Sequence, residues 1–311
     1  MHKLYCAYLI FPILEAKYLE KIRKASAAGK FYDAGKNQLE ESIKNCFLDK
    51  RGPKQIANKE KTDKKIIGAV VPHAGYIYSG AIAAHSYNKI KKSGFADTFI
   101  ILGPNHTGIG SAVSTMTKGK WETPLGQIKI NKEISKKIKK DIIDDDENAH
   151  SYEHSIEVQI PFLQYISNKE EFDFVPISMS MQDNETSKEI GEIIANVIKN
   201  SNNNVIIIAS SDFSHVGFNY QSMPPEGMQV DEYAEKQDTL AIEKILNLDP
   251  QGLINTVYEK NITMCGYGPI ASMLYASKIL GAKKAELLKY GTSYEVHPGS
   301  SCVGYGSIVV Y

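Results

Sequence analysis

The stretch IIGAVV at residues 66–71 decides the fold class, and the polar turn PHAG at residues 72–75 follows it directly. Two further runs have the same form, TFIIL at residues 98–102 and VIIIA at residues 205–209. All three are rich in β-branched residues and show no alternation of apolar and polar positions, as expected for strands covered on both faces. The sequence therefore predicts an α/β fold with a mostly parallel central sheet.

Helix-like stretches alternate with these runs, which favours a layered fold with helices flanking the sheet. We expect helices at residues 79–92, 132–140, 155–167, 185–200, 231–247 and 268–280.

Shorter segments add to the predicted sheet. Residues 111–116 and 127–130, separated by WETPLG, are typical of a hairpin, and residues 285–290 and 303–310 predict two more strands. Residues 219–230 contain two prolines and a glycine, and they predict a long loop that is either a lid or an inert connection.

The composition is that of a globular protein. Hydrophobic residues make up 42% of the 311-residue chain and charged residues 23%, with a formal net charge of zero. The length suits one domain, expected at residues 23–311. Arg23 and Arg51 are the two arginines, so a phosphate clamp built from arginine is not expected. The neutral charge and the evenly spread lysines give no indication of nucleic-acid binding.

Four cysteines, Cys6, Cys46, Cys265 and Cys302, are scattered along the chain and form no C-x-x-C pair. A disulfide framework is therefore not expected, and the default compartment is a reducing cytoplasm. The apolar run YCAYLIFPIL near the amino terminus is too short to span a membrane, so no membrane role is expected. Residues 1–22 are expected to be an amino-terminal extension, with a signal-like segment or a mis-assigned start as alternatives.

Histidines follow the ends of the three apolar runs. His73, His106 and His215 each come a few residues after one run, and Asp212 precedes His215 in SSDFSH. Ligands of open α/β sheets bind beyond the carboxyl ends of the strands, so these loops are expected to converge. Several imidazolium ions cannot be desolvated side by side, and a cluster of neutral imidazoles is suited to binding a metal.

Two further residues are candidates for the same site. Cys265, in NITMCGYGPI, directly precedes a predicted helix and is either a metal ligand or a small buried apolar residue. His154, in SYEHSIEVQIP, either lines the cleft or forms a structural hydrogen bond. The neighbouring Ser155 and Glu157, and also Glu153, are interpreted as helix-start residues. His150 and His297 lie in polar segments and are weaker candidates.

The motifs extend from residue 27 to the carboxyl end, and together they resemble the Memo family. Archaeal and bacterial members of this family are often labelled AmmeMemoRadiSam system protein B. The segments that carry the resemblance are AAGKFYD, VVPHAGYIYSG, ILGPNHTG, WETPLG, EHSIEVQIPFL, SSDFSHVG, TMCGYGPI and the closing strand. The resemblance implies a fold similar to the catalytic subunit of class III extradiol dioxygenases, which use non-haem iron.

The resemblance also implies roles for individual residues. Matching motifs place the family's proposed metal ligands at His73, His106 and Cys265. Cys265 takes the position of the dioxygenase carboxylate ligand, and a thiolate favours softer metals, so ring cleavage is not implied. Iron is the first expectation for the metal, with copper and zinc behind it.

Catalytic and substrate-binding roles follow from the same motifs. His215 matches the dioxygenase base and is expected to move a proton, while Asp212 holds or charges it. His154 and Asn105, from EHS and GPNH, are expected to contact substrate.

The leading hypothesis is a cytoplasmic, metal-binding and redox-active Memo-family protein with an unidentified substrate. One alternative is an adaptor that binds a small molecule or peptide in the same pocket without chemistry. A second alternative is hydrolysis by a Cys265 thiolate, for which no oxyanion hole is evident. Family association implies AMMECR1-like and radical SAM proteins as partners.

Overall fold

In the described part of the chain, twelve strands form the central sheet. The structure is a computed structural model that describes residues 21–58, 65–168 and 170–311. The strands are β1 (Ile22–Arg23), β2 (Gly68–Val71), β3 (Thr98–Pro104), β4 (Val113–Thr115), β5 (Lys120–Thr123), β6 (Gly126–Ile130), β7 (Asp144–Asp145), β8 (Asp173–Met179), β9 (Val205–Ser210), β10 (His215–Gly217), β11 (Ala285–Thr292) and β12 (Ser301–Val310). Their order is β1-β5-β6-β8-β3-β9-β2-β12-β10, with β11 beside β12, β4 beside β8 and β7 beside β4.

The centre of this sheet is parallel, as predicted. Strands β6, β8, β3, β9 and β2 all run in the same direction, and β12 then pairs with β2 in the antiparallel sense. Every residue of β2, β3 and β9 is buried. Alternate residues contribute to different cores: Ile100 and Leu102 of β3 pack on one face, and Phe99 and Ile101 pack on the other. The unbroken apolar runs are therefore explained by burial on both faces.

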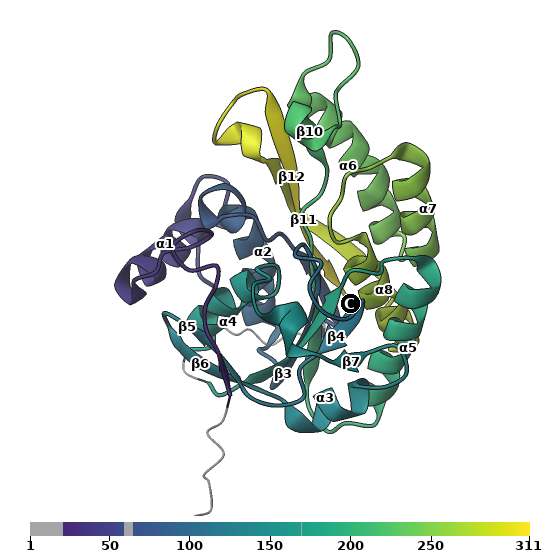
Figure 1. Ribbon diagram of the computed structural model, residues 1–311. Coiled ribbons are helices and arrows are strands. Elements are labelled where there is room, and N and C mark those ends of the chain that lie inside the picture. The colour runs from purple at the N-terminus through teal and green to yellow at the C-terminus, as the bar shows by residue number, and fades with distance from the viewer. Residues whose placement is uncertain (1–20, 59–64, 169) are drawn as a thin grey trace, which may run out of the picture.

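Among the residues that the structure describes, eight α-helices cover the two faces of the sheet (Figure 1). They are α1 (Lys36–Leu48), α2 (Ala81–Ser93), α3 (Lys132–Ile138), α4 (Ile160–Ile166), α5 (Asn184–Lys199), α6 (Val230–Leu246), α7 (Pro250–Lys260) and α8 (Tyr267–Ile279). Helices α1, α2 and α4 share one apolar core with the sheet, while α3 and α5 to α8 share the other. All six predicted helices are present with shifted ends, and α1 and α7 were not predicted.

The first strand of the predicted hairpin is wrong, because β6 pairs with β5 and not with residues 111–116. WETPLG does not connect two strands, because Lys120–Thr123 is itself β5 and pairs antiparallel with β6. The alternating burial of β5, with the Trp121 side chain fully enclosed, explains this strand. Val113–Thr115, which lies within the predicted first strand, pairs instead with β8 and β7. The two predicted carboxyl-terminal strands are β11 and β12, which are antiparallel neighbours.

Strand β8 was not predicted, and Pro176 in its middle explains why. Proline lacks the N–H that a central strand needs on both sides. One edge of β8 pairs with β3 along its whole length. On the other edge, β6 pairs with residues 173–174 and β4 with residues 177–179. Pro176 therefore lies opposite the gap between β6 and β4, where its missing N–H breaks no hydrogen bond between strands.

Most of the predicted amino-terminal extension, residues 1–20, lies outside the described residues. Among the helices that the structure describes, none is both long and apolar enough to cross a membrane.

Candidate metal and ligand site

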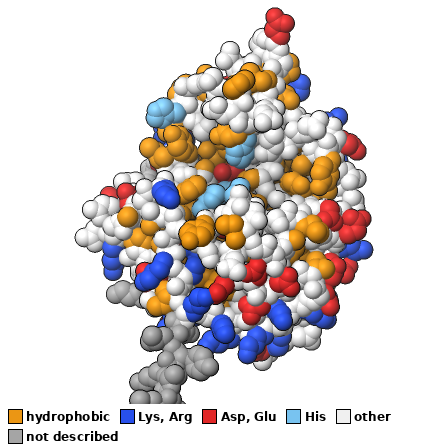
Figure 2. Space-filling view, viewed as in Figure 1, with side chains coloured by type: hydrophobic (Ala, Val, Ile, Leu, Met, Phe, Trp, Pro, Cys, Tyr) orange, Lys and Arg blue, Asp and Glu red, His pale blue; other side chains and the backbone are white. Residues whose placement is uncertain are grey.

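The histidine loops converge beyond the carboxyl ends of the parallel strands. His73 follows β2, His106 follows β3, and His215 follows β9 as the first residue of β10. All three line a cavity of about 450 Å³, together with His154 and Asp212. Figure 2 shows histidine side chains gathered in a hollow on one face of the molecule. The sheet topology thus places the predicted residues in one site.

Three potential metal ligands lie within reach of one ion. One donor atom from each of His73, His106 and Cys265 lies within 4.8 Å of the other two. His73 Nε2 and Cys265 Sγ lie 3.1 Å apart. Donors around an ion at roughly 2.0–2.3 Å have separations of this order. Gln182 fixes the approach of the thiol, because its Nε2 donates to the Cys265 carbonyl at 2.9 Å. The geometry suits coordination, and the ligand role itself stays a prediction.

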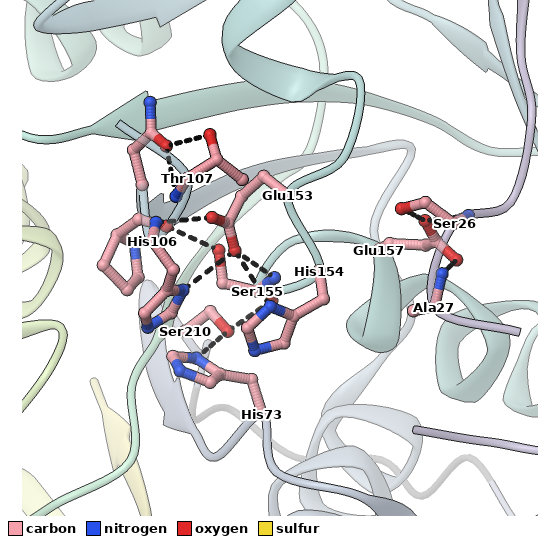
Figure 3. Close-up of polar contacts among 12 residues, drawn as sticks. Ser26, Ala27, His73, His106, Thr107, Glu153, His154, Ser155, Glu157 and Ser210 are labelled. Atoms are coloured by element: carbon pink, nitrogen blue, oxygen red, sulfur yellow. Dashed lines mark hydrogen bonds and ion pairs between the residues drawn. The ribbon is translucent and has the colours of Figure 1, made fainter. Parts of the chain in front are cut away.

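A chain of buried hydrogen bonds holds His73 in one orientation (Figure 3). The Ser210 hydroxyl donates to the Ser155 carbonyl at 2.6 Å and accepts from Gln159 Nε2 at 2.7 Å. Since its single proton is used, Ser210 can only accept from His73 Nδ1, which lies 3.0 Å away. The neutral ring then has its lone pair on Nε2, which faces the Cys265 sulfur.

Burial keeps the imidazole rings of His73 and His154 neutral. Desolvation, followed by the nearby charges of His106 and His154, holds the pKa of His73 well below its usual range. Desolvation also lowers the pKa of His154 to about 4, although the carboxylate of Glu153 opposes the shift. Both rings are therefore uncharged at neutral pH, which is the form that binds metal.

Burial affects Cys265 in the opposite sense. Desolvation, with the charge of Asp212 adding to it, raises the pKa of the Cys265 thiol. The thiol therefore stays protonated at neutral pH unless a cation lies beside it. A coordinated divalent ion removes that proton outright.

Asp212 supports the backbone of the His73 loop. Its Oδ1 accepts the N–H groups of His73 at 2.7 Å and Ala74 at 3.2 Å. Burial raises the pKa of Asp212, while the charge of His215 and these N–H groups oppose the shift. The described residues include no hydrogen bond between Asp212 and His215, so the expected holding role is not what its contacts indicate.

Two backbone carbonyls orient His215 instead. His215 Nδ1 lies 3.0 Å from the Phe213 carbonyl and 3.1 Å from the Thr263 carbonyl. Carbonyls only accept, so Nδ1 carries a proton, and in the neutral form of the ring the lone pair is on Nε2. Tyr220, from the predicted loop, packs its ring edge-on against His215 at 5.0 Å between centroids and also lines the cavity.

Asn105 organises its own loop. Its Oδ1 accepts from the Thr107 N–H and hydroxyl and from the Gly108 N–H, and its Nδ2 donates to the Ile109 carbonyl. Asn105 is not among the residues that line the cavity. The expected contact with substrate therefore has no support from its position, because the amide is used inside the turn.

The helix-start interpretation is right for the position of Glu157, which lies in the first turn of the 3₁₀ segment that precedes α4, but Ser155 does not cap that segment. The Ser155 hydroxyl donates to the Pro104 carbonyl at 2.9 Å, and no side-chain cap forms there. The side chains of Glu153 and Glu157 are fully buried. Glu153 faces two site histidines, His106 and His154. The one feature of the sequence that could have pointed to Glu153 was its position directly before His154.

Glu157 lies outside the cavity lining and binds the amino-terminal segment. It forms a buried ion pair with Arg23 and accepts the N–H groups of Ser26 and Ala27, each at 2.9 Å, and the Tyr32 hydroxyl. This segment carries Phe31, whose ring stacks on His154 at 4.1 Å between centroids and lines the cavity. Phe31 lies in the motif AAGKFYD, for which no site role was predicted.

The two weaker histidine candidates differ. His297 is exposed and lines the cavity. His150 is fully buried outside the cavity lining, with its Nε2 3.2 Å from the Ser114 hydroxyl and no hydrogen-bond partner for its Nδ1. Burial, with the charge of Arg23, lowers the pKa of His150 to about 3. His150 is thus a neutral core residue.

Acid should destabilise the fold through His150. Its pKa is lower in the folded protein than in the unfolded chain, so the unfolded chain binds the proton first as the pH falls below about 6.5. Between pH 7 and pH 4.5, His150→Gln should lose less unfolding free energy than the parent, by on the order of 2 kcal/mol. Urea unfolding at both pH values measures this difference, and equal losses would contradict it.

A family model and similar sequences from other organisms indicate one family. The family model described as "Memo-like protein" matches residues 23–309. A MEMO1 family protein of Methanococcus vannielii is 46% identical over 295 residues, covering 93% of this chain and 99% of the relative. A second, from Methanopyrus kandleri, is 43% identical, with 92% and 98% covered. A crystal structure of the uncharacterized protein JW3007 from Escherichia coli matches with a TM-score of 0.47 and 13% identity, covering 79% of this chain and 99% of that one.

Proposed function

The chain belongs to the Memo-like protein family, and from this premise we propose that it binds one metal ion at His73, His106 and Cys265. The observation that carries the proposal is the approach of three donor atoms to within 4.8 Å of one another. The buried, neutral His73 ring supports it, because its lone-pair nitrogen faces the thiol.

Iron is the first candidate for this ion. Two imidazoles and one thiolate also suit copper(I) and zinc, because a thiolate is a soft ligand. A bound ion would supply Lewis-acid or redox chemistry by orienting and polarising a substrate or dioxygen. On this proposal the protein is a cytoplasmic oxidoreductase.

The protein's own residues would then position a ligand and move protons. His215 Nε2 has a free lone pair at the cavity and can accept a proton from a bound molecule. Phe31, Tyr220 and Tyr305 give the cavity aromatic walls. Among the residues that line this cavity, none is Lys or Arg. We therefore propose a small neutral or cationic ligand in place of a phosphate or carboxylate.

Two other functions have weaker support. Hydrolysis by Cys265 needs a thiolate, and burial raises the pKa of that thiol. A non-catalytic adaptor would use the same cavity for a small molecule or peptide, and AMMECR1-like or radical SAM proteins would be partners in either case. Metal content distinguishes the adaptor from the enzyme.

Protein purified without added metal under anaerobic conditions should carry close to one ion per chain. Iron, copper and zinc are measured together by elemental analysis, from cells grown in medium that is not enriched in one metal. A thiolate site should lose its metal on acidification, because the ligands take up protons. A preparation without stoichiometric metal that also fails to take up iron(II), copper(I) or zinc would contradict the proposal and favour the adaptor.

A further inference from the structure

Glu153 is a buried carboxylate that contacts two histidines of the site at once (Figure 3). Its Oε2 accepts the backbone N–H of His106 at 2.5 Å, and its Oε1 accepts the backbone N–H of Ser155 at 2.8 Å. The same Oε1 lies 3.0 Å from His106 Nδ1 and 3.3 Å from His154 Nδ1. Both backbone bonds fix the carboxylate, so its position does not depend on the two rings.

The direction of these contacts follows from the chemistry of a carboxylate. Both oxygens of Glu153 accept a backbone N–H group, Oε2 from His106 and Oε1 from Ser155, and bonds of this kind favour the ionised form of a carboxyl group. An ionised carboxylate can only accept hydrogen bonds. A ring nitrogen that bonds to it must therefore carry the proton.

We propose that Glu153 is a positioning residue that fixes the proton on Nδ1 of both His106 and His154 and so directs the lone pairs on both Nε2 atoms into the cavity. This inference deepens the proposed function and depends on it where His106 is named as a ligand. The tautomers themselves are properties of the metal-free protein.

A packing role alone does not explain why a hydrogen-bond acceptor lies at Nδ1 of these rings. Free neutral histidine favours the tautomer with the proton on Nε2, so a ring with its proton on Nδ1 needs a fixed acceptor there. Ser210 serves His73 in the same way. The three rings lie close together, with centroids 4.7 Å apart for His106 and His154 and 5.2 Å for His73 and His106. Three lone pairs thus face one small volume, which suits a metal and a polar ligand.

A different interpretation of the same atoms is a second ion held by His106, Glu153 and His154, whose donor atoms also lie within 4.8 Å of one another. Such an ion would have to displace the Nδ1 protons of His106 and His154. It would also bind Glu153 Oε1, which already accepts the backbone N–H of Ser155. Protons satisfy all these contacts without a further charge. The second ion is therefore an outcome for the experiment to exclude.

Imidazole nitrogen shifts in metal-free protein with ¹⁵N-labelled histidine test the proposal directly. The parent should show His73, His106 and His154 as Nδ1–H tautomers at neutral pH. Glu153→Gln replaces the carboxylate with an amide, whose N–H₂ group donates and whose oxygen accepts more weakly than a carboxylate oxygen. The tautomers of His106 and His154 should therefore shift toward Nε2–H, while the tautomer of His73 stays unchanged. Ser210→Ala is the matched control and should shift His73 alone.

The metal affinity of the same variants provides a second readout. Loss of an orienting carboxylate typically weakens metal binding about tenfold to a hundredfold. Nε2–H tautomers of His106 and His154 in the parent would overturn the proposal, as would an unchanged pair in a folded Glu153→Gln. Two ions per chain, falling to one in Glu153→Gln, would overturn it in favour of the second ion. If the parent binds no metal but has the expected tautomers, the proposed function fails and the role of Glu153 stands.

Discussion

Cys265→Ser should remove most of the bound metal while leaving the fold intact. The substitution exchanges a soft thiolate for a hydroxyl of similar size, and a neutral hydroxyl is a poor ligand beside two imidazoles. Cys265 is half-buried two residues before α8, and its carbonyl bond to Gln182 does not involve the sulfur. The measurement is iron, copper and zinc per chain, with thermal unfolding of metal-free protein to check the fold.

His215→Ala is the control for this experiment. His215 lies at the cavity with its Nδ1 bonded to backbone carbonyls, and the three proposed ligands do not include it. Most of the metal should therefore remain while any proton transfer is lost. If His215→Ala removes the metal and Cys265→Ser retains it, the two roles have been assigned the wrong way round.

Glu157→Ala should lower the unfolding free energy by about 3–5 kcal/mol, because it leaves the buried Arg23 charge without its partner. The Arg23 and Glu157 side chains are 6% and 0% exposed, so water cannot replace the lost carboxylate. The donors of Ser26, Ala27 and Tyr32 lose an acceptor as well. Urea unfolding at pH 7 measures the loss.

Two further variants separate charge from packing. Glu133→Ala breaks the exposed pair with Lys137 and should leave the urea midpoint almost unchanged. Arg23→Met combined with Glu157→Leu removes both charges and should recover much of the loss. If the double variant is as unstable as Glu157→Ala, the hydrogen bonds and the shape of the site matter more than the unpaired charge.

The parallel core and the convergence of the histidines could be predicted because both depend on local sequence. Uninterrupted β-branched runs are specific to strands buried on both faces, and residues that follow such strands meet at one edge. Helices α1 and α7 had local signals that were not used. Buried Leu39, Ile43 and Phe47 recur at helical spacing in α1, and an Asp-Pro pair begins α7.

The supporting residues of the site could not be predicted from local patterns. Glu157 looks like a helix-start residue until the fold brings Arg23 to it from 134 positions away. Glu153 meets His106 across 47 positions, and Ser210 meets His73 across 137. A carboxylate or hydroxyl has the same sequence signature whether it caps a helix or orients a ring. Its role is decided by long-range contacts alone.

The three proposed ligands also set an order of events during synthesis. His73 and Cys265 meet across 192 positions, and the strand ends that carry the two histidines belong to a parallel sheet, whose non-local contacts form slowly. A nascent chain that has reached only His106 has two imidazoles and no thiolate. The ligand set is complete only once Cys265, just before α8, has been synthesised, so an ion bound by all three ligands would stabilise the folded protein over the unfolded chain by mass action.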